Sequence, residues 1–185
     1  IFMGYDAGGG AWADAGSTGN VGIGNYVMDS ALNGAISNTA IGHEALSSPT
    51  TADYNVAIGK GTLGTMTTGD KNVAIGLSAG YYNVVGQYNA LLGYEAGAYA
   101  TGSYNTLVGY YAGRGSQLSA PYCSGEKNTS LGYRALTAFT TGTNNVAIGY
   151  YAAFQATTNS GYVAIGYKAL YANYGGNVVG IGYEA

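Results

Sequence analysis

The sequence predicts an all-β protein, a parallel β-solenoid of about eleven coils in which one repeat of about 17 residues forms one coil. Two observations predict it: a glycine preceded by a large apolar residue returns eleven times along the 185 residues, and the residues around it form regular columns. A third observation is composition. Glycine accounts for 33 of the 185 residues, against an average of about 7%, and only 8% of the residues are charged, against an average of about 25%. This composition excludes an ordinary enzyme domain.

The recurring glycines, called anchor glycines below, set the period. They are spaced by 20, 18, 17, 17, 17, 16, 23, 17, 17 and 16 residues. Seventeen residues are fewer than the roughly 33 of helix-pair repeats and the roughly 20–29 of leucine-rich repeats. At about 3.3 Å per residue they suffice for two strands of four to six residues and two turns, stacked about 4.8 Å from the next coil. The anchor glycines are Gly4, Gly24, Gly42, Gly59, Gly76, Gly93, Gly109, Gly132, Gly149, Gly166 and Gly182.

The residues before each anchor glycine predict a short strand. The consensus Asn-Val-Ala-Ile-Gly has a β-branched centre bounded by Asn and Gly. Alternation along a strand places Val and Ile on one face and Asn and Ala on the other. Both faces are largely apolar, and a thin coil can bury only one of them in its own interior. The other face therefore needs a partner, and we expect it to be a second copy of this chain.

Three columns have structural roles that stacking predicts. Each anchor glycine is expected to supply a positive φ or a close backbone approach at a corner. The column four residues before the anchor predicts an amide ladder along the stack. Tyr follows the anchor in seven repeats, and these rings are expected to stack where they occur on successive coils. The ladder asparagines are Asn20, Asn38, Asn55, Asn72, Asn89, Asn105, Asn128 and Asn145.

We interpret residues 1–185 as a single repeat domain and as a segment of a longer fibre protein. The 23-residue repeat predicts a loop insertion within 113–128, and insertions in solenoids map to one face, often the binding face. Arg114 and Tyr122 are the candidate surface contacts there, although a bulge without function fits the pattern as well. Trp12, the only tryptophan, is the second candidate and lies in the glycine-rich segment 6–19.

The repeat itself resembles a known type. The segments NTAIGHEAL (38–46), NVAIGLSAG (72–80) and NVAIGYYAA (145–153) are similar to the repeats of YadA-like trimeric autotransporter adhesin heads and of bacteriophage tail fibres. The resemblance covers nearly the whole chain. It implies a left-handed β-roll that packs as a homotrimer. The 17-residue period and the Tyr after the anchor depart from the adhesin pattern and favour the phage fibres.

The residue pattern predicts no catalytic, cofactor-binding or metal site. His43 is the only histidine and Cys123 the only cysteine, so neither a triad nor a cysteine metal cluster can be built. The acids of one column, Asp6, Glu44 and their equivalents, are two or more coils apart and are interpreted as surface residues. A net charge near −3 argues against nucleic acid, and the lack of any run of 18 apolar residues argues against membrane insertion.

We therefore expect a non-enzymatic structural and adhesive fibre segment, a phage tail-fibre shaft or head located on the virion. Its expected partners are itself, as a homotrimer, and a host-surface glycan or protein. The main alternative is the head of a bacterial trimeric autotransporter adhesin, at the cell surface or in the extracellular space. Two further alternatives fit the residue pattern less well. The first, a tailspike-type polysaccharide depolymerase, requires paired carboxylates in a groove. An ice-binding solenoid requires flat threonine ranks, whereas pairs such as Thr67 and Thr68 fall at a predicted turn.

Overall fold

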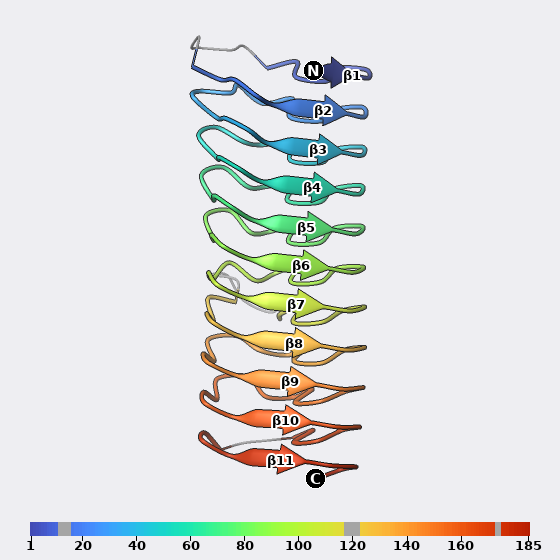
Figure 1. Ribbon diagram of the computed structural model, residues 1–185, viewed down its shortest axis with the longest axis vertical. Coiled ribbons are helices and arrows are strands. Elements are labelled where there is room, and N and C mark those ends of the chain that lie inside the picture. Colours follow the sequence, from blue (N-terminus) through green and yellow to red (C-terminus); the bar gives the residue numbers. More distant parts are fainter. Residues whose placement is uncertain (11–15, 117–122, 173–174) are drawn as a thin grey trace.

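The computed structural model describes residues 1–10, 16–116, 123–172 and 175–185. In these ranges the chain winds into a rod of stacked coils with its two termini at opposite ends (Figure 1). The strands of this part of the chain form one parallel sheet of eleven, ordered as in the sequence, which confirms the predicted parallel β-solenoid. Their bounds are β1 Phe2–Met3, β2 Val21–Ile23, β3 Thr39–Ile41, β4 Val56–Ile58, β5 Val73–Ile75, β6 Ala90–Leu92, β7 Thr106–Val108, β8 Thr129–Leu131, β9 Val146–Ile148, β10 Val163–Ile165 and β11 Val179–Ile181.

The register keeps each column in line. Ala57 pairs with Ala74, one repeat of 17 residues further on, and flanking Val and Ile pair in the same way. The irregular repeats keep this register, since Thr106 pairs with Thr129 across the 23-residue spacing. The alignment of the strands is therefore the same across the irregular spacing.

The prediction of two strands in each coil was wrong. Each coil of the described ranges has one strand, three residues long except for the two residues of β1. The residues that follow an anchor glycine include left-handed positions, such as Glu44 at φ 56° and Leu46 at φ 46°, which interrupt any second extended run. The return segment behind the strands is still bonded from coil to coil: the Glu44 N–H donates to the Asn25 carbonyl, and the Leu46 N–H to the Thr62 carbonyl.

The interior of the coil is filled by small side chains from most strands and by larger ones from the return segment. The middle residue of each strand points inward, as Ala57 and Ala74 do, with both side chains fully buried. Leu63 on the return segment packs into the same core. The residues on either side of the central alanine point out of the coil, as β-strand alternation predicts. The core therefore combines strand alanines with larger side chains such as Leu63 and Phe139, while most Val and Ile side chains of the strands line the outer surface of the sheet.

Candidate functional site

The asparagine ladder (the eight asparagines of the predicted column) lies inside the coil next to the strands. All eight side chains are 0–6% exposed. Asn38 shows the repeating pattern: its Nδ2 donates to Asn20 Oδ1 at 3.1 Å and to the Ala52 carbonyl at 2.7 Å. Its backbone N–H donates to the same Asn20 Oδ1 at 2.9 Å. The Asn38 amide therefore bonds the asparagine of the previous coil and also crosses the interior to a backbone carbonyl at the opposite turn.

The ladder ends at Tyr162, which takes the asparagine position in the tenth coil. Its backbone N–H still donates to Asn145 Oδ1 at 3.2 Å. Its ring is fully buried, its hydroxyl has no hydrogen-bond partner, and burial raises the pKa of this phenol. The Tyr162 ring therefore occupies the position that an asparagine side chain holds in the preceding coils, and its buried hydroxyl is left without a hydrogen bond.

The anchor glycines combine the two properties expected of this column. All eleven have φ between 130° and 141°, a region that residues with a β-carbon rarely adopt. From Gly4 to Gly166, a β-carbon at each anchor would lie 2.2–2.7 Å from the backbone oxygen of the next anchor. The glycines at the opposite turn act differently: Gly69 has no positive φ, but a β-carbon there would lie 2.4 Å from the Gly86 oxygen.

The outer surface of the sheet, called the strand face below, is apolar except for Thr39, Thr106 and Thr129. It is built from the first and third residues of the strands. Ile75 is 38% exposed, Leu131 47% and Ile181 64%. The strands are aligned one below another (Figure 1), so these side chains form two parallel columns rather than scattered contacts. In the described ranges these side chains remain partly to largely exposed.

Six tyrosines that follow anchor glycines form a continuous stack on coils six to eleven. Their rings lie 4.9–5.5 Å apart, centroid to centroid, with interplanar angles of 6–12°. These tyrosines lie at the corner after each strand, where the chain turns back behind the sheet. We call this stack the tyrosine ladder: Tyr94, Tyr110, Tyr133, Tyr150, Tyr167 and Tyr183.

Of the three candidate surface contacts, only Arg114 lies in the described residues. Trp12 and Tyr122 lie outside them, as do residues 117–122 of the predicted insertion. The Arg114 guanidinium lies over the rings of Tyr99, at 5.1 Å, and Tyr111, at 4.9 Å. Its Nε is 2.5 Å from a Glu95 carboxylate oxygen, and both side chains are largely buried. Arg114 is therefore held in place by an ion pair and two rings.

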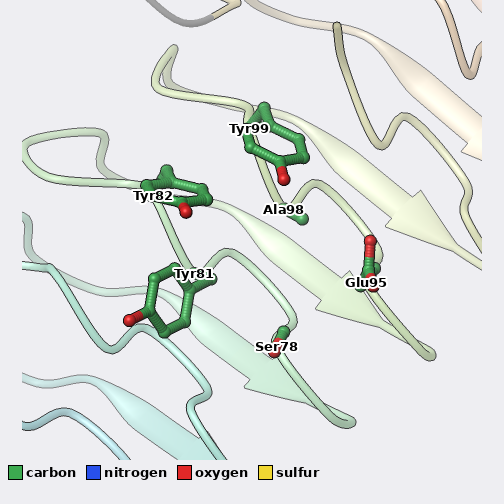
Figure 2. A pocket seen from close by; sticks show the side chains of 6 residues that line it. All are labelled: Ser78, Tyr81, Tyr82, Glu95, Ala98 and Tyr99. Carbon is green, nitrogen blue, oxygen red and sulfur yellow. The ribbon is translucent and has the colours of Figure 1, made fainter. Parts of the chain in front are cut away.

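Glu95 also lines a small cavity of about 220 Å³ (Figure 2). The rings of Tyr82 and Tyr99, from successive coils, stack at 4.8 Å on one side of it, and Tyr81 lies edge-on to Tyr82. Glu95 is the only carboxylate among the described lining residues, and Arg114 already neutralises it. The arrangement offers aromatic surface without a free acid or base.

The remaining chemical groups are dispersed. His43 lies edge-on to Tyr26, and its Nδ1 is 3.4 Å from a Glu44 oxygen on the adjacent residue. Burial raises the pKa of the Cys123 thiol, whose residue pairs with Ala100 where the chain rejoins the coil. In the described part of the chain, no group of three or more His, Cys, Asp or Glu side chains is placed to hold a metal ion. The same residues contain no helix that could cross a membrane.

Comparisons with family models, curated proteins and solved structures found no match to this chain.

Proposed function

We propose that this chain is a structural and adhesive segment of a homotrimeric surface fibre, a phage tail-fibre shaft or head that holds a host-binding region away from the particle. The strand face carries the proposal. It is roughly 10 Å wide and 48 Å long, with a projected area on the order of 500 Å². That is at the upper end of the apolar patches that soluble monomers expose.

The shape of the strand face favours copies that run side by side in the same direction. The column of third strand residues is large and apolar at every coil, so one rod offers a similar surface to a neighbour along its length. Copies related by a rotation axis along the rod would bury this surface over their full length. The number three comes from the resemblance of the repeats to those of trimeric adhesin heads and tail fibres.

The hydrogen bonding suits a mechanical role. Between the fourth and fifth coils, the Val56 N–H donates to the Asn72 carbonyl and the Gly76 N–H to the Ile58 carbonyl, both bonds crossing from coil to coil. Asn72 Nδ2 adds a bond of 3.0 Å to Asn55 Oδ1 inside the coil. Because these bonds run along the rod, a pull on its ends must break several of them at each step.

Cysteine cross-linking tests whether the strand faces meet. Ile75→Cys places a thiol on the strand face, whereas Gln155→Cys places one on the exposed return segment between β9 and β10. Under mild oxidation we expect covalent dimers from Ile75→Cys and none from Gln155→Cys. The unmodified chain, whose buried Cys123 has a raised thiol pKa, is the background control. Equal cross-linking of both variants, or of neither, would contradict side-by-side packing through the strand face.

A further inference from the structure

A hollow of about 430 Å³ lies beside the tyrosine ladder on coils eight to ten. We call it the aromatic–basic hollow. Arg134 and Lys168 both line it, and the remaining lining residues are aromatic. The rings of Phe154 and Tyr171 stack at 5.3 Å, and Tyr151 lies edge-on to Phe154 at 4.8 Å. Tyr150 and Tyr167 of the tyrosine ladder complete the lining.

The fold does not require aromatic residues at these positions. In the column of the tyrosine ladder, the second to fifth coils carry Asn25, His43, Lys60 and Leu77. Those coils keep the same strand register and the same anchor geometry as the coils with tyrosine. The coil itself therefore does not need the rings of this column, and two of them, Tyr150 and Tyr167, line the hollow together with the two cations.

Arg134 has aromatic neighbours but no acidic partner. Its guanidinium lies 5.2–5.9 Å from the ring centroids of Tyr111, Tyr133 and Tyr151, and its Nη1 donates to the Tyr151 hydroxyl at 3.3 Å. No carboxylate of the described residues forms an ion pair with it. Arg114 has a similar aromatic setting, but Glu95 neutralises it. The charge of Arg134 is therefore available to an external anion.

Lys168 adds a second cation at the same hollow. It lies over the rings of Tyr167 and Tyr171, and a hydrogen bond to Tyr167 raises the pKa of its ammonium. Its only ion pair in the described chain is a long one of 3.8 Å to the exposed Glu184. Arg134 and Lys168 belong to coils two apart, which stacking separates by about 9.6 Å. The hollow is thus a basic site on a chain whose net charge is −3.

We propose that the aromatic–basic hollow binds an acidic saccharide. A carboxylate of the sugar pairs with the Arg134 guanidinium, and the apolar C–H face of the ring packs against the aromatic side chains. A second acidic sugar of the same oligosaccharide reaches Lys168. The proposal names the chemical class of the host-surface ligand that the fibre segment would contact. It rests on the proposed function only for that biological role, because the binding itself depends on the hollow alone.

Two other ligand classes fit the hollow less well. An acidic peptide that binds as an added strand needs an unpaired sheet edge, and β8, β9 and β10 are paired on both sides. Nucleic acid binding requires many phosphate contacts, and the chain has six basic residues against nine acidic ones. A saccharide needs only the one or two cations and the aromatic surface that the hollow provides.

Calorimetric titration of the complete 185-residue chain at physiological salt tests the site. The probe is trigalacturonic acid, with its methyl ester as the uncharged counterpart and acetate as the simple anion. We expect trigalacturonic acid to bind, and its methyl ester to bind about tenfold more weakly or worse, because a charge-assisted hydrogen bond is lost. Arg134→Gln should weaken binding by a similar factor, and Lys168→Gln by less.

Lys71→Gln is the matched control. Lys71 also lies over a tyrosine, Tyr88, and also forms a hydrogen bond with its hydroxyl, but it is remote from the hollow. This variant should bind as the unmodified chain does. Absence of binding, equal affinity of the Arg134→Gln variant, equal affinity for the methyl ester, or full displacement by equimolar acetate would each overturn the proposal. Sedimentation of the same samples separates this result from assembly, because a trimer that does not bind contradicts only the saccharide site.

Discussion

The α-carbon of Gly76 packs against the backbone of Gly93 in the next coil so closely that a β-carbon at Gly76 would lie 2.3 Å from the Gly93 oxygen. Gly76 also has a φ of 132°, which disfavours any residue with a side chain. Because the next anchor glycines repeat this contact, the column fixes how closely the coils approach at the corner after each strand. Close backbone packing between successive coils therefore requires a glycine at each of these anchor positions.

The first prediction follows from this contact. Gly76→Ala should lower the free energy of unfolding by about 2–5 kcal/mol, because backbone strain adds to a steric clash that the stack cannot relieve. Gly34→Ala is the control, since Gly34 also has a positive φ, 87°, but a β-carbon there meets nothing within 4 Å. It should cost about 1–2 kcal/mol. Chemical denaturation followed by circular dichroism measures both, and equal losses would contradict the packing role.

The asparagine ladder makes the second prediction. Asn72 Oδ1 accepts two hydrogen bonds from Asn89, and Asn72 Nδ2 donates to the Gly86 carbonyl at 2.9 Å. Asn72→Leu leaves the buried backbone N–H of Asn89 without its acceptor, at a cost of about 1–3 kcal/mol. Asn25→Leu should change stability far less, since Asn25 is exposed and Leu77 takes the same column three coils later. Thermal unfolding tests the pair, and an unchanged midpoint for Asn72→Leu would show that the ladder is not stabilising.

The third prediction concerns the end of the ladder. The Tyr162 hydroxyl is buried without a hydrogen-bond partner, so its removal takes away a desolvation cost. Tyr162→Phe should stabilise the chain by about 1 kcal/mol. Tyr150→Phe, on the exposed tyrosine ladder, should have almost no effect. A thermal midpoint that falls in the Tyr162→Phe variant would mean that the hydroxyl has a partner in solution.

The sequence predicted the period and the register because a stacked repeat puts equivalent residues in columns. It predicted that Val and Ile share one face of the strand and Ala the other, but not which of the two faces points inward. The single short strand of each coil was not predictable from the same columns. Glu44 and Leu46 both adopt left-handed φ, and neither residue type signals that conformation. The aromatic–basic hollow also escaped prediction. Arg134 and Phe154 are 20 residues apart in the sequence, and only the winding of the coils brings them to one hollow.

The fourth prediction is a pH dependence. Burial raises the pKa of Asp29 above its ordinary 3.8, and the negative charges of Asp6 and Glu44 raise it further. The folded state therefore tolerates the ionised form less well than the unfolded state does. The contribution of Asp29 to the free energy of unfolding is fully present below pH 3.8 and is lost as the pH rises through its raised folded-state pKa.

Asp29→Asn removes the carboxylate whose ionisation destabilises the folded state. The variant should melt at a higher temperature than the unmodified chain at pH 7, and the difference should disappear at pH 3. Calorimetric scans of both proteins at the two pH values provide the measurement. A larger advantage at pH 3 than at pH 7 would reverse the sign and refute the assignment.

The fifth prediction separates assembly from folding. Ile75 points out of the coil, so Ile75→Asp should leave the far-ultraviolet circular dichroism of the coil intact while it prevents copies from packing. Gln155→Asp, on the exposed return segment, should preserve the assembled species. Loss of the coil signal in Ile75→Asp would place this residue in the interior and contradict its outward position.

Sedimentation equilibrium of the unmodified 185-residue chain tests the central claim most directly. The apolar strand face predicts a stable assembly, and the proposed function predicts a homotrimer with three times the chain mass of 18.7 kDa. This mass should persist at micromolar concentration. A soluble monomer of 18.7 kDa under the same conditions would contradict the trimer and the fibre function that depends on it.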